Sequence, residues 1–289
     1  MTTLTSQPSV ARVRVPARSV RGELRAIKIV WQRELIRFGN DRLRIVTSLI
    51  QPILFLFVLG TGLSRLTGGS TEGVDLRTFI FPGILAMAVM FTAMFSAASI
   101  VWDREFGFLR EMLVAPVRRS SIVIGKCLGG ATVASFQGIV VLALAGLVGV
   151  PYDPTLLLSV FGIQLLLAFT ITAFGVMMSA RVTQMQSFMA LTQMLIMPLF
   201  FLSGAMFPVS GLPRWLTVLN RLDPLTYAVD PMRRAVFSHL SLPAAARARL
   251  DPGVTWGSWH VPSWLEALVV AGLGLVFLFI AIAEFNRPE

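Results

Sequence analysis

Six apolar stretches, each long enough to cross a lipid bilayer as a helix, divide the chain. A helix rises 1.5 Å per residue, so about 20 apolar residues span the hydrocarbon core. We therefore predict an all-α integral membrane protein with six transmembrane helices. The third stretch is long enough to tilt or to include an interfacial turn. The stretches are Ile45–Leu63, Phe79–Val101, Ile122–Val150, Leu156–Ala180, Phe188–Phe207 and Trp264–Ala283.

The composition excludes several other classes of protein. Hydrophobic residues make up 55% of the 289 residues and charged residues 14%, whereas a soluble domain carries about 25% charged residues. Disorder requires low hydrophobicity and high charge, so it is expected only at the N-terminus. A disulfide scaffold is excluded because Cys127 is the single cysteine.

The distribution of basic residues predicts the orientation in the membrane. Ten of the 25 Lys and Arg residues precede the first span, together with three acidic residues. Basic residues beside a first span hold that end in the cytoplasm, and an even number of spans places the C-terminus there too. Residues 208–262, assigned outside, carry six Arg against three Asp, but a long loop has little weight in this rule. We predict a multi-pass protein of the cell (inner or plasma) membrane with both termini cytoplasmic.

The chain divides into three regions. Residues 1–20, rich in Ser, Thr, Pro and Arg, predict a disordered basic tail. Residues 21–43 carry apolar side chains at spacings of three and four, which predicts an amphipathic helix in the cytoplasmic interface. Packing of this helix on the protein's own cytoplasmic ends is an equally good interpretation. Residues 44–284 form the six-span domain, with a cytoplasmic loop at 103–119 and an outer segment at 208–262.

Prolines cut the outer segment into pieces too short to cross the membrane. We expect short helices at 212–219 and 224–237, before the sixth span, which dip into or lie on the outer leaflet. Trp256, Trp259 and Trp264 are typical of an aromatic belt at the membrane surface.

Motifs for catalysis, metal binding and nucleotide binding are missing. The sequence has no H-E-x-x-H, no G-x-S-x-G and no P-loop, and its two histidines both lie in the outer segment. We therefore expect no enzyme activity from this chain alone, no metal and no bound cofactor. Nucleic acid is not an expected partner, because no aromatic side chains interleave with the basic ones.

Few ionisable or amide side chains lie in the spans. Lys126, Glu266 and Glu284 lie near span ends, where snorkelling to the surface is the default interpretation. Four glutamines are expected to form hydrogen bonds between helices more often than to bind a substrate. They are Gln51, Gln137, Gln164 and Gln193.

The first cytoplasmic loop, residues 103–119, reads DREFGFLREMLVAPVRR. If the second span continues as a helix to Pro116, then Phe106, Leu109 and Leu113 share one stripe and the charged residues face elsewhere. Such an element suits docking on a cytosolic partner. A solvated loop helix packed on its own spans is equally compatible with the pattern.

This loop resembles that of the type-2 ABC transporter permease family, especially its daunorubicin/doxorubicin-resistance branch, with the approximate pattern D-R-E-x-G-T-L-x-x-L-x-x-x-P. The sequence matches at Asp103, Arg104, Glu105, Gly107, Leu109 and Pro116, and has Phe108 where Thr is usual. Residues 201–213 (FLSGAMFPVSGLP) and 222–237 (LDPLTYAVDPMRRAVF) also look like the family. The resemblance covers about residues 21–284.

The resemblance implies a homodimer, or a pair with a related permease, that binds two copies of a cytosolic ATPase subunit carrying ATP and Mg. It also implies that the first cytoplasmic loop couples the permease to the ATPase. The coupling residues are Asp103, Arg104, Glu105, Phe106, Gly107, Leu109, Arg110, Glu111 and Pro116.

The resemblance also implies a substrate path between the second and fifth spans. The Met and Phe side chains there are Met87, Met90, Met94, Met194, Met197, Phe91, Phe95, Phe200 and Phe201. Flexible thioethers and flat rings suit an amphipathic substrate, although packing is the commoner role of such residues. We expect an ATP-driven exporter of hydrophobic or amphipathic molecules such as drugs or lipids. The alternatives are an exporter of a cell-envelope lipid, glycolipid or polysaccharide, and a non-transporting membrane scaffold that docks a cytosolic partner.

Overall fold

The structure, a computed structural model, describes residues 19–62, 75–108, 112, 117–206, 213–240, 243, 250, 253–256 and 259–287. The predicted tail at residues 1–20 lies almost entirely outside these ranges. Four residues predicted to couple to an ATPase also lie outside them: Leu109, Arg110, Glu111 and Pro116.

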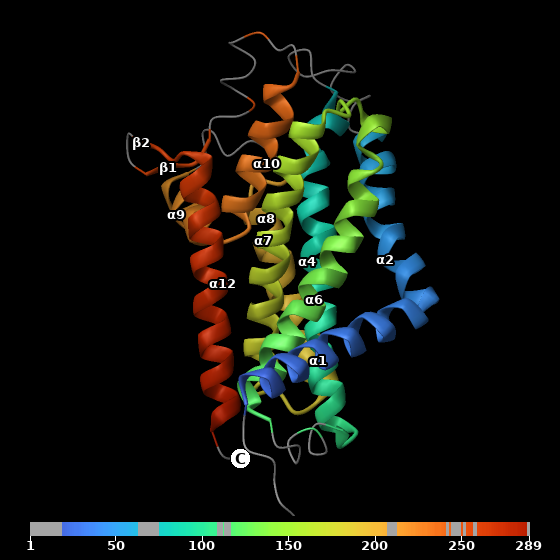
Figure 1. The fold of residues 1–289 in the computed structure, drawn as a ribbon. Helices are drawn as coiled ribbons and strands as arrows, with labels where there is room; N and C mark the ends of the chain where they lie inside the picture. Colours follow the sequence, from blue (N-terminus) through green and yellow to red (C-terminus); the bar gives the residue numbers. More distant parts are fainter. Residues whose placement is uncertain are drawn as a thin grey trace, which may run out of the picture.

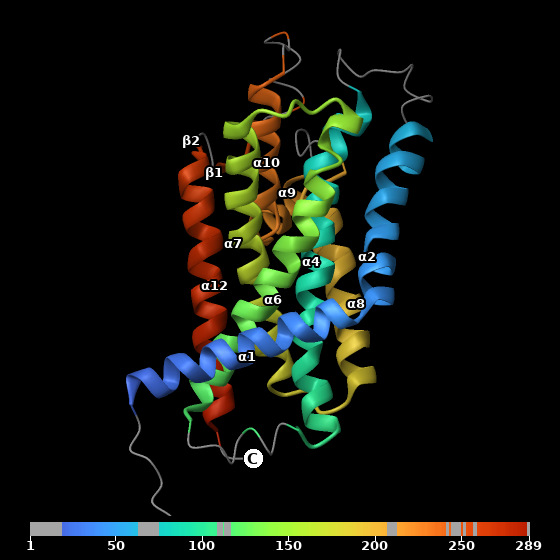
Figure 2. The ribbon, with the colours of Figure 1, turned by 45° about the vertical axis from the view of Figure 1, so that its right-hand side comes forward.

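Within these ranges, six long apolar helices run side by side through the bundle, which confirms the predicted fold class (Figures 1 and 2). They are α2 (Arg42–Leu54, continued by the π-helical turn η1, Phe55–Leu59), α4 (Leu76–Glu105), α6 (Arg119–Leu142), α7 (Pro154–Ser179), α8 (Met185–Leu202) and α12 (Ser263–Asn286). The third predicted span includes a turn rather than a tilt. α6 ends at Leu142, and the 3-10 turn η2 (Ala145–Val148) leads to Gly149, whose φ is +79°.

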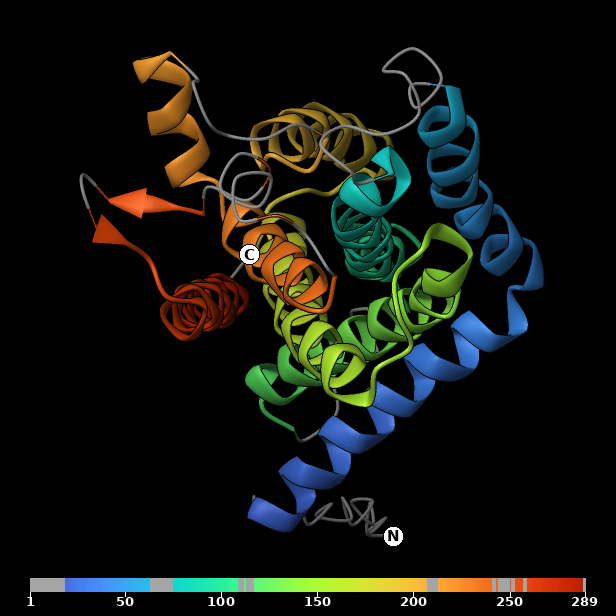
Figure 3. The ribbon, with the colours of Figure 1, turned by 90° about the horizontal axis from the view of Figure 1, so that it is seen from above.

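Helix α4 forms the centre of the bundle, and α2, α8 and α12 form its periphery. Seen from above, α6, α7 and α8 surround α4 (Figure 3). Within their most apolar windows, 89% of residues are buried in α4 but only 17% in α2 with η1. Small residues allow close approach: a Cβ at Gly175 of α7 would lie 2.6 Å from the Cβ of Ala97 on α4. The peripheral helices therefore present most of their apolar surface outward.

Helix α1 (Val20–Asn40) crosses one end of the bundle and packs on α6 (Figures 2 and 3). A Cβ at Gly125 would lie 2.8 Å from Cβ of Val30, so the glycine admits α1 closely. Trp31 Nε1 donates a hydrogen bond to Thr132 Oγ1 at 3.0 Å. These contacts confirm packing on the protein itself. Ile29 and Ile36 on the opposite side, and Leu24 near the start of the helix, are exposed, which is compatible with an interfacial position.

The predicted helix at 21–43 is too long by three residues, because the chain bends at Asp41. Asp41 has φ −94° and ψ 71°, which are not helical, and its carboxylate accepts a hydrogen bond from the backbone N–H of Arg44 at 3.0 Å. It is thus the N-cap of α2. The result is an elbow, at which α1 ends and the first span begins.

The end of the bundle opposite α1 carries α9 (Arg214–Leu222), α10 (Thr226–Ser238) and a small antiparallel pair, β1 (Thr255–Trp256) and β2 (Trp259–His260). The two short helices confirm the prediction. However, α10 enters the bundle and packs on α7, α12 and α4 instead of lying on the leaflet. Arg233 of α10 is buried there, with Nη2 2.6 Å from the carbonyl of Gly204.

Helix α1 and the last turn of α12 lie at the same end of the bundle (Figure 1). The Arg119 guanidinium donates a hydrogen bond to the carbonyl of Phe285 at 2.8 Å, and the carboxylate of Glu23 accepts one from the backbone N–H of Arg118 at 3.1 Å. The first helix and the end of α12 are thereby joined to the start of α6. This agrees with an even number of spans.

Candidate functional site

A buried cluster of charged side chains lies where α1 crosses the bundle. Lys126 Nζ of α6 lies 2.6 Å from Glu34 Oε1 of α1, 2.5 Å from Asp103 Oδ2 of α4 and 3.0 Å from Ser99 Oγ. The three ionised side chains are at most 4% exposed. The prediction that Lys126 snorkels to the surface is therefore wrong, because two carboxylates bind the ammonium group inside the protein.

Arginines of α1 complete the cluster. Arg33 donates a hydrogen bond to Asp103 Oδ1 at 2.6 Å, and Arg37 lies 3.5 Å from the same oxygen. Arg33 also contacts Met112 Sδ in the following loop at 2.9 Å. Burying an unpaired charge costs free energy. The pairs therefore hold α1, α4 and α6 together as long as each buried charge keeps its partner.

The last residues of α4 bind other parts of the same chain. The Arg104 guanidinium donates hydrogen bonds of 2.7–3.0 Å to the carbonyls of Ser179, Ala180 and Val182, which end α7 and follow it. The carboxylate of Glu105 accepts a hydrogen bond from the backbone N–H of Met185, the first residue of α8, at 3.2 Å. Arg104 and Glu105 thus position the α7–α8 connection.

The second span does not continue as an unbroken helix to Pro116, which was the condition for the stripe expected in the loop. It ends at Glu105, and Gly107 has φ +82°, a left-handed conformation that favours glycine. Gly107 therefore turns the chain directly after the helix. Asp103 is 3% exposed and belongs to the ion cluster, so it offers no docking surface. Phe106 and Phe108, by contrast, are 64% and 55% exposed.

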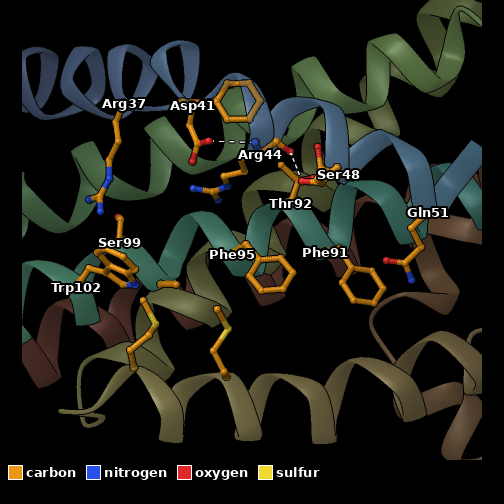
Figure 4. A pocket seen from close by; sticks show the side chains of 15 residues that line it. Arg37, Asp41, Arg44, Ser48, Gln51, Phe91, Thr92, Phe95, Ser99 and Trp102 are labelled. Carbon is orange, nitrogen blue, oxygen red and sulfur yellow. Dashed lines mark hydrogen bonds between the residues drawn. The ribbon is translucent and has the colours of Figure 1, made fainter.

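A cavity of about 570 Å³ lies between the elbow, α4 and α8 (Figure 4). Its walls differ in chemistry. Helices α1 and α2 and the elbow contribute charged and polar groups and one ring, Phe38. Helix α4 contributes three aromatic rings and three small side chains, and α8 contributes two methionines. The lining residues are Arg37, Phe38, Asp41, Arg44, Thr47, Ser48, Gln51, Phe91, Thr92, Phe95, Ala98, Ser99, Trp102, Met185 and Met189.

The predicted substrate-path residues separate into three groups. Phe91 and Phe95 line the cavity. Met87, Met90, Met94 and Phe200 are at most 2% exposed, so they pack in the core as the alternative interpretation states. Met194, Met197 and Phe201 are 72%, 37% and 52% exposed on α8.

Most of the residues that line the cavity are not among the predicted substrate-path residues. Arg44, Ser48 and Gln51 line it from α2 at spacings of four and three, so they form a polar stripe on an apolar span. That spacing is visible in the sequence and marks a face turned away from lipid. Arg37, Trp102 and the two methionines carry no such signal, because only the fold brings them to the cavity.

The other polar residues of the spans mostly pair within the bundle. Gln137 accepts a hydrogen bond from Ser48 at 3.1 Å, and Gln164 donates one to the carbonyl of Ser135 at 3.2 Å, as predicted. Glu266 is fully buried and lies 3.0 Å from Arg234 of α10, so the snorkelling interpretation is wrong for it. Glu284 pairs with Arg181 at 2.9 Å.

The fold and the cavity define a multi-pass helical membrane protein with an amphipathic chamber beside its central helix. The family model described as ABC-2 type transporter matches residues 25–237. The chain belongs to this family of transport permeases. The matched range includes every residue that lines the cavity and every residue of the ion cluster.

Three relatives illustrate the range of the family. Nodulation protein J of Rhizobium leguminosarum bv. trifolii is 30% identical over 216 residues, which cover 73% of this chain and 80% of that protein. The protein ycf38 of Cyanophora paradoxa, named as a transport permease, is 28% identical over 218 residues, 74% of each chain. YbhR of Escherichia coli K12, named as a multidrug ABC transporter permease, is 30% identical over 172 residues, 58% of this chain and 46% of YbhR.

Proposed function

We propose that the chain is the transmembrane permease subunit of an ATP-driven exporter that moves hydrophobic or amphipathic molecules, such as drugs or lipids, out of the cell. One observation carries this proposal. A single helix, α4, lines the cavity between Phe91 and Trp102 and, directly after Trp102, joins the ion cluster and leads into the loop. A displacement of the loop is thus transmitted to the cavity wall by a rigid element.

The ATPase partner that the family implies would dock at the α1 end of the bundle. A second hollow of about 480 Å³ lies there, lined by Arg33, Ile36, Arg37, Trp102, Asp103, Phe106 and Phe108. The exposed rings of Phe106 and Phe108 supply the apolar anchors that protein interfaces need. Coupling through Leu109, Arg110, Glu111 and Pro116 remains part of the proposal, and ATP and Mg would be bound by the partner.

A second permease copy would cover the exposed faces of α2 and α8. Val58 and Met194 are 65% and 72% exposed, and α8 packs mainly on α4. We propose a homodimer with two ATPase subunits in the cell membrane, with the α1 end in the cytoplasm. The concentration of basic residues at this end supports that orientation.

Two other functions compete with this one. Export of a cell-envelope lipid, glycolipid or polysaccharide uses the same cavity, and placement in the daunorubicin-resistance branch would favour drugs instead. A non-transporting scaffold needs no amphipathic chamber beside its central helix, so the cavity argues against it.

The test is reconstitution of the permease with ABC ATPase subunits from the same organism. We expect a stable complex, ATP hydrolysis, and ATP-dependent movement of a fluorescent lysophospholipid across proteoliposomes. An ATPase with its catalytic glutamate replaced is the control, because it binds the permease without driving transport. A permease that binds no ATPase, or a complex that hydrolyses ATP without moving this or any other amphipath of a test panel, would contradict the proposal.

A further inference from the structure

The cavity is positively charged at the elbow. Arg37 at the end of α1 and Arg44 at the start of α2 both line it, and both reach toward the row of α4 side chains (Figure 4). Among the described lining residues, Asp41 is the one acidic side chain. It is committed to the backbone N–H of Arg44 as the cap of α2. The cavity lining therefore carries two guanidinium groups and one carboxylate.

One nitrogen of the Arg44 guanidinium lacks an acceptor among the described residues. This atom, Nη2, is buried. A guanidinium carries five donors in a planar fork that matches carboxylate and phosphate oxygens, and a buried donor without an acceptor is unfavourable. The free donor beside the cavity therefore favours a bound anion.

Arg37 is the second available cation. Asp103 Oδ1 accepts a hydrogen bond from Arg33 at 2.6 Å, so Arg37 approaches that oxygen only to 3.5 Å. The Arg37 guanidinium lies 5.7 Å from the centroid of the Trp102 ring, and 37% of the side chain is exposed. It is close enough to the cavity to bind a ligand without leaving the cluster.

An apolar surface continues from the charged end. The rings of Phe91 and Phe95 are stacked, with centroids 6.3 Å apart and planes at 23°. Met185 and Met189 of α8 also line the cavity. Flat rings and flexible thioethers together fit an alkyl chain of variable shape.

We propose that this cavity binds an amphipath with an anionic headgroup, a phosphate or carboxylate, with Arg44 and Arg37 on the headgroup and Phe91 and Phe95 along the chain. The inference rests on the proposed function only in treating the ligand as cargo. Binding itself needs neither ATP nor the partner. Phosphate chemistry is common to a lipid headgroup and to free phosphate, so the test separates the two sources.

The experiment measures saturable binding of radiolabelled dodecyl phosphate to the purified permease in phosphatidylcholine nanodiscs, with empty nanodiscs as background. Dodecylphosphocholine, dodecyltrimethylammonium and inorganic phosphate are the competitors. We expect dodecyl phosphate to bind at least roughly tenfold more tightly than the other three, as loss of a charge-assisted hydrogen bond predicts. Comparable competition by inorganic phosphate would replace the amphipath with a simple anion site and overturn the proposal.

The matched variants are Arg44→Gln and Arg42→Gln. Arg42 is exposed at the same elbow and does not line the cavity. R44Q should weaken binding by roughly tenfold or more, R44K should restore most of it, and R42Q should leave it unchanged. Equal affinity of R44Q and the unchanged protein, or preference for the cationic amphipath, would refute the anion site. Because no ATPase is present, either result leaves the test of transport independent.

Discussion

Lys126 of α6 and Glu34 of α1 form an ion pair of 2.6 Å in which neither side chain is more than 4% exposed. The pair joins a helix that crosses the end of the bundle to one that runs through it. Asp103, 2.5 Å from the same ammonium group, adds the end of the central helix α4. Three elements far apart in the sequence are thus fixed at one point, directly before the loop proposed to receive the ATPase.

Lys126→Met should strongly destabilise the protein, because it leaves the buried carboxylate of Glu34 without its cation and removes one of the cations that bind Asp103. Removing one partner of a buried pair costs about 3–5 kcal/mol. The measurement is the thermal unfolding midpoint of the purified permease. Lys28→Met, at an exposed position of α1, is the control and should change little.

A compensated variant separates charge from packing. Replacing both members of the buried pair, as Glu34→Gln and Lys126→Met together, removes the unpaired carboxylate and leaves Asp103 bound to Arg33, so the double variant should recover much of the stability lost in the single variant. If the double variant is as unstable as the single one, the cluster acts through shape and not through charge pairing.

The six spans were predictable because the length of an apolar run is a local property that the bilayer alone dictates. The charge cluster could not be predicted, because Lys126 and Glu34 lie 92 positions apart and no local sequence pattern indicates that they pair. The pattern at 103–105 was recognised, but its residues serve their own chain: Asp103 enters the cluster and Arg104 binds the end of α7. Motif matching located an important segment, and only the contacts assigned the roles.

The elbow and the cavity could have been found in part. Gly39, Asn40 and Asp41 are turn-forming residues in succession, and they mark the break between α1 and α2. The three polar side chains Arg44, Ser48 and Gln51, spaced four and three residues apart, indicate the wall of the cavity that α2 forms. The opposite walls depend on the packing of α4 and α8, which no single-sequence pattern specifies.

The stability of the α9–α10 junction should depend on pH through Asp223. Burial raises the pKa of this carboxyl to about 8. Between the unfolded value near 4 and about 8 the folded state binds the extra proton, so the free energy of unfolding falls as pH rises, by at most about 1.4 kcal/mol per pH unit. Unfolding midpoints at pH 5, 6.5 and 8 measure this trend.

Asp223→Asn supplies the control for that measurement. The amide is neutral at every pH and its oxygen still accepts the hydrogen bond from the backbone N–H of Leu225, which is 2.9 Å long. We expect the variant to lose the part of the pH dependence between 5 and 8 and to be more stable than the unchanged protein at pH 8. The same slope in both proteins would show that the carboxyl is already ionised when folded.

Phe106→Ala combined with Phe108→Ala should weaken docking of the ATPase. The two rings are the exposed apolar groups at the start of the loop, and truncating an anchor of this kind typically costs 2 kcal/mol or more, roughly thirtyfold in affinity. Affinity for the ATPase in detergent measures the effect. Phe279→Ala, an equally exposed ring on α12, should have none. Normal ATPase affinity in the double variant would place the docking surface elsewhere.

Gly125→Val should separate α1 from α6. A Cβ at this position would lie 2.8 Å from Cβ of Val30 and 3.0 Å from the backbone carbonyl of Ile27, so α1 must move by more than a side-chain rotation. Gly272→Val is matched to it, because that glycine also lies in a span and has nothing within 4 Å of an added Cβ. Overpacking costs about 1–3 kcal/mol, which is enough to increase hydrogen exchange along α1 while the bundle stays folded. Since α1 carries Glu34 and Arg37, its displacement should also weaken binding of dodecyl phosphate at the cavity. If α1 remains as protected in Gly125→Val as in Gly272→Val, its position is set by the ion cluster and not by close packing at the glycine.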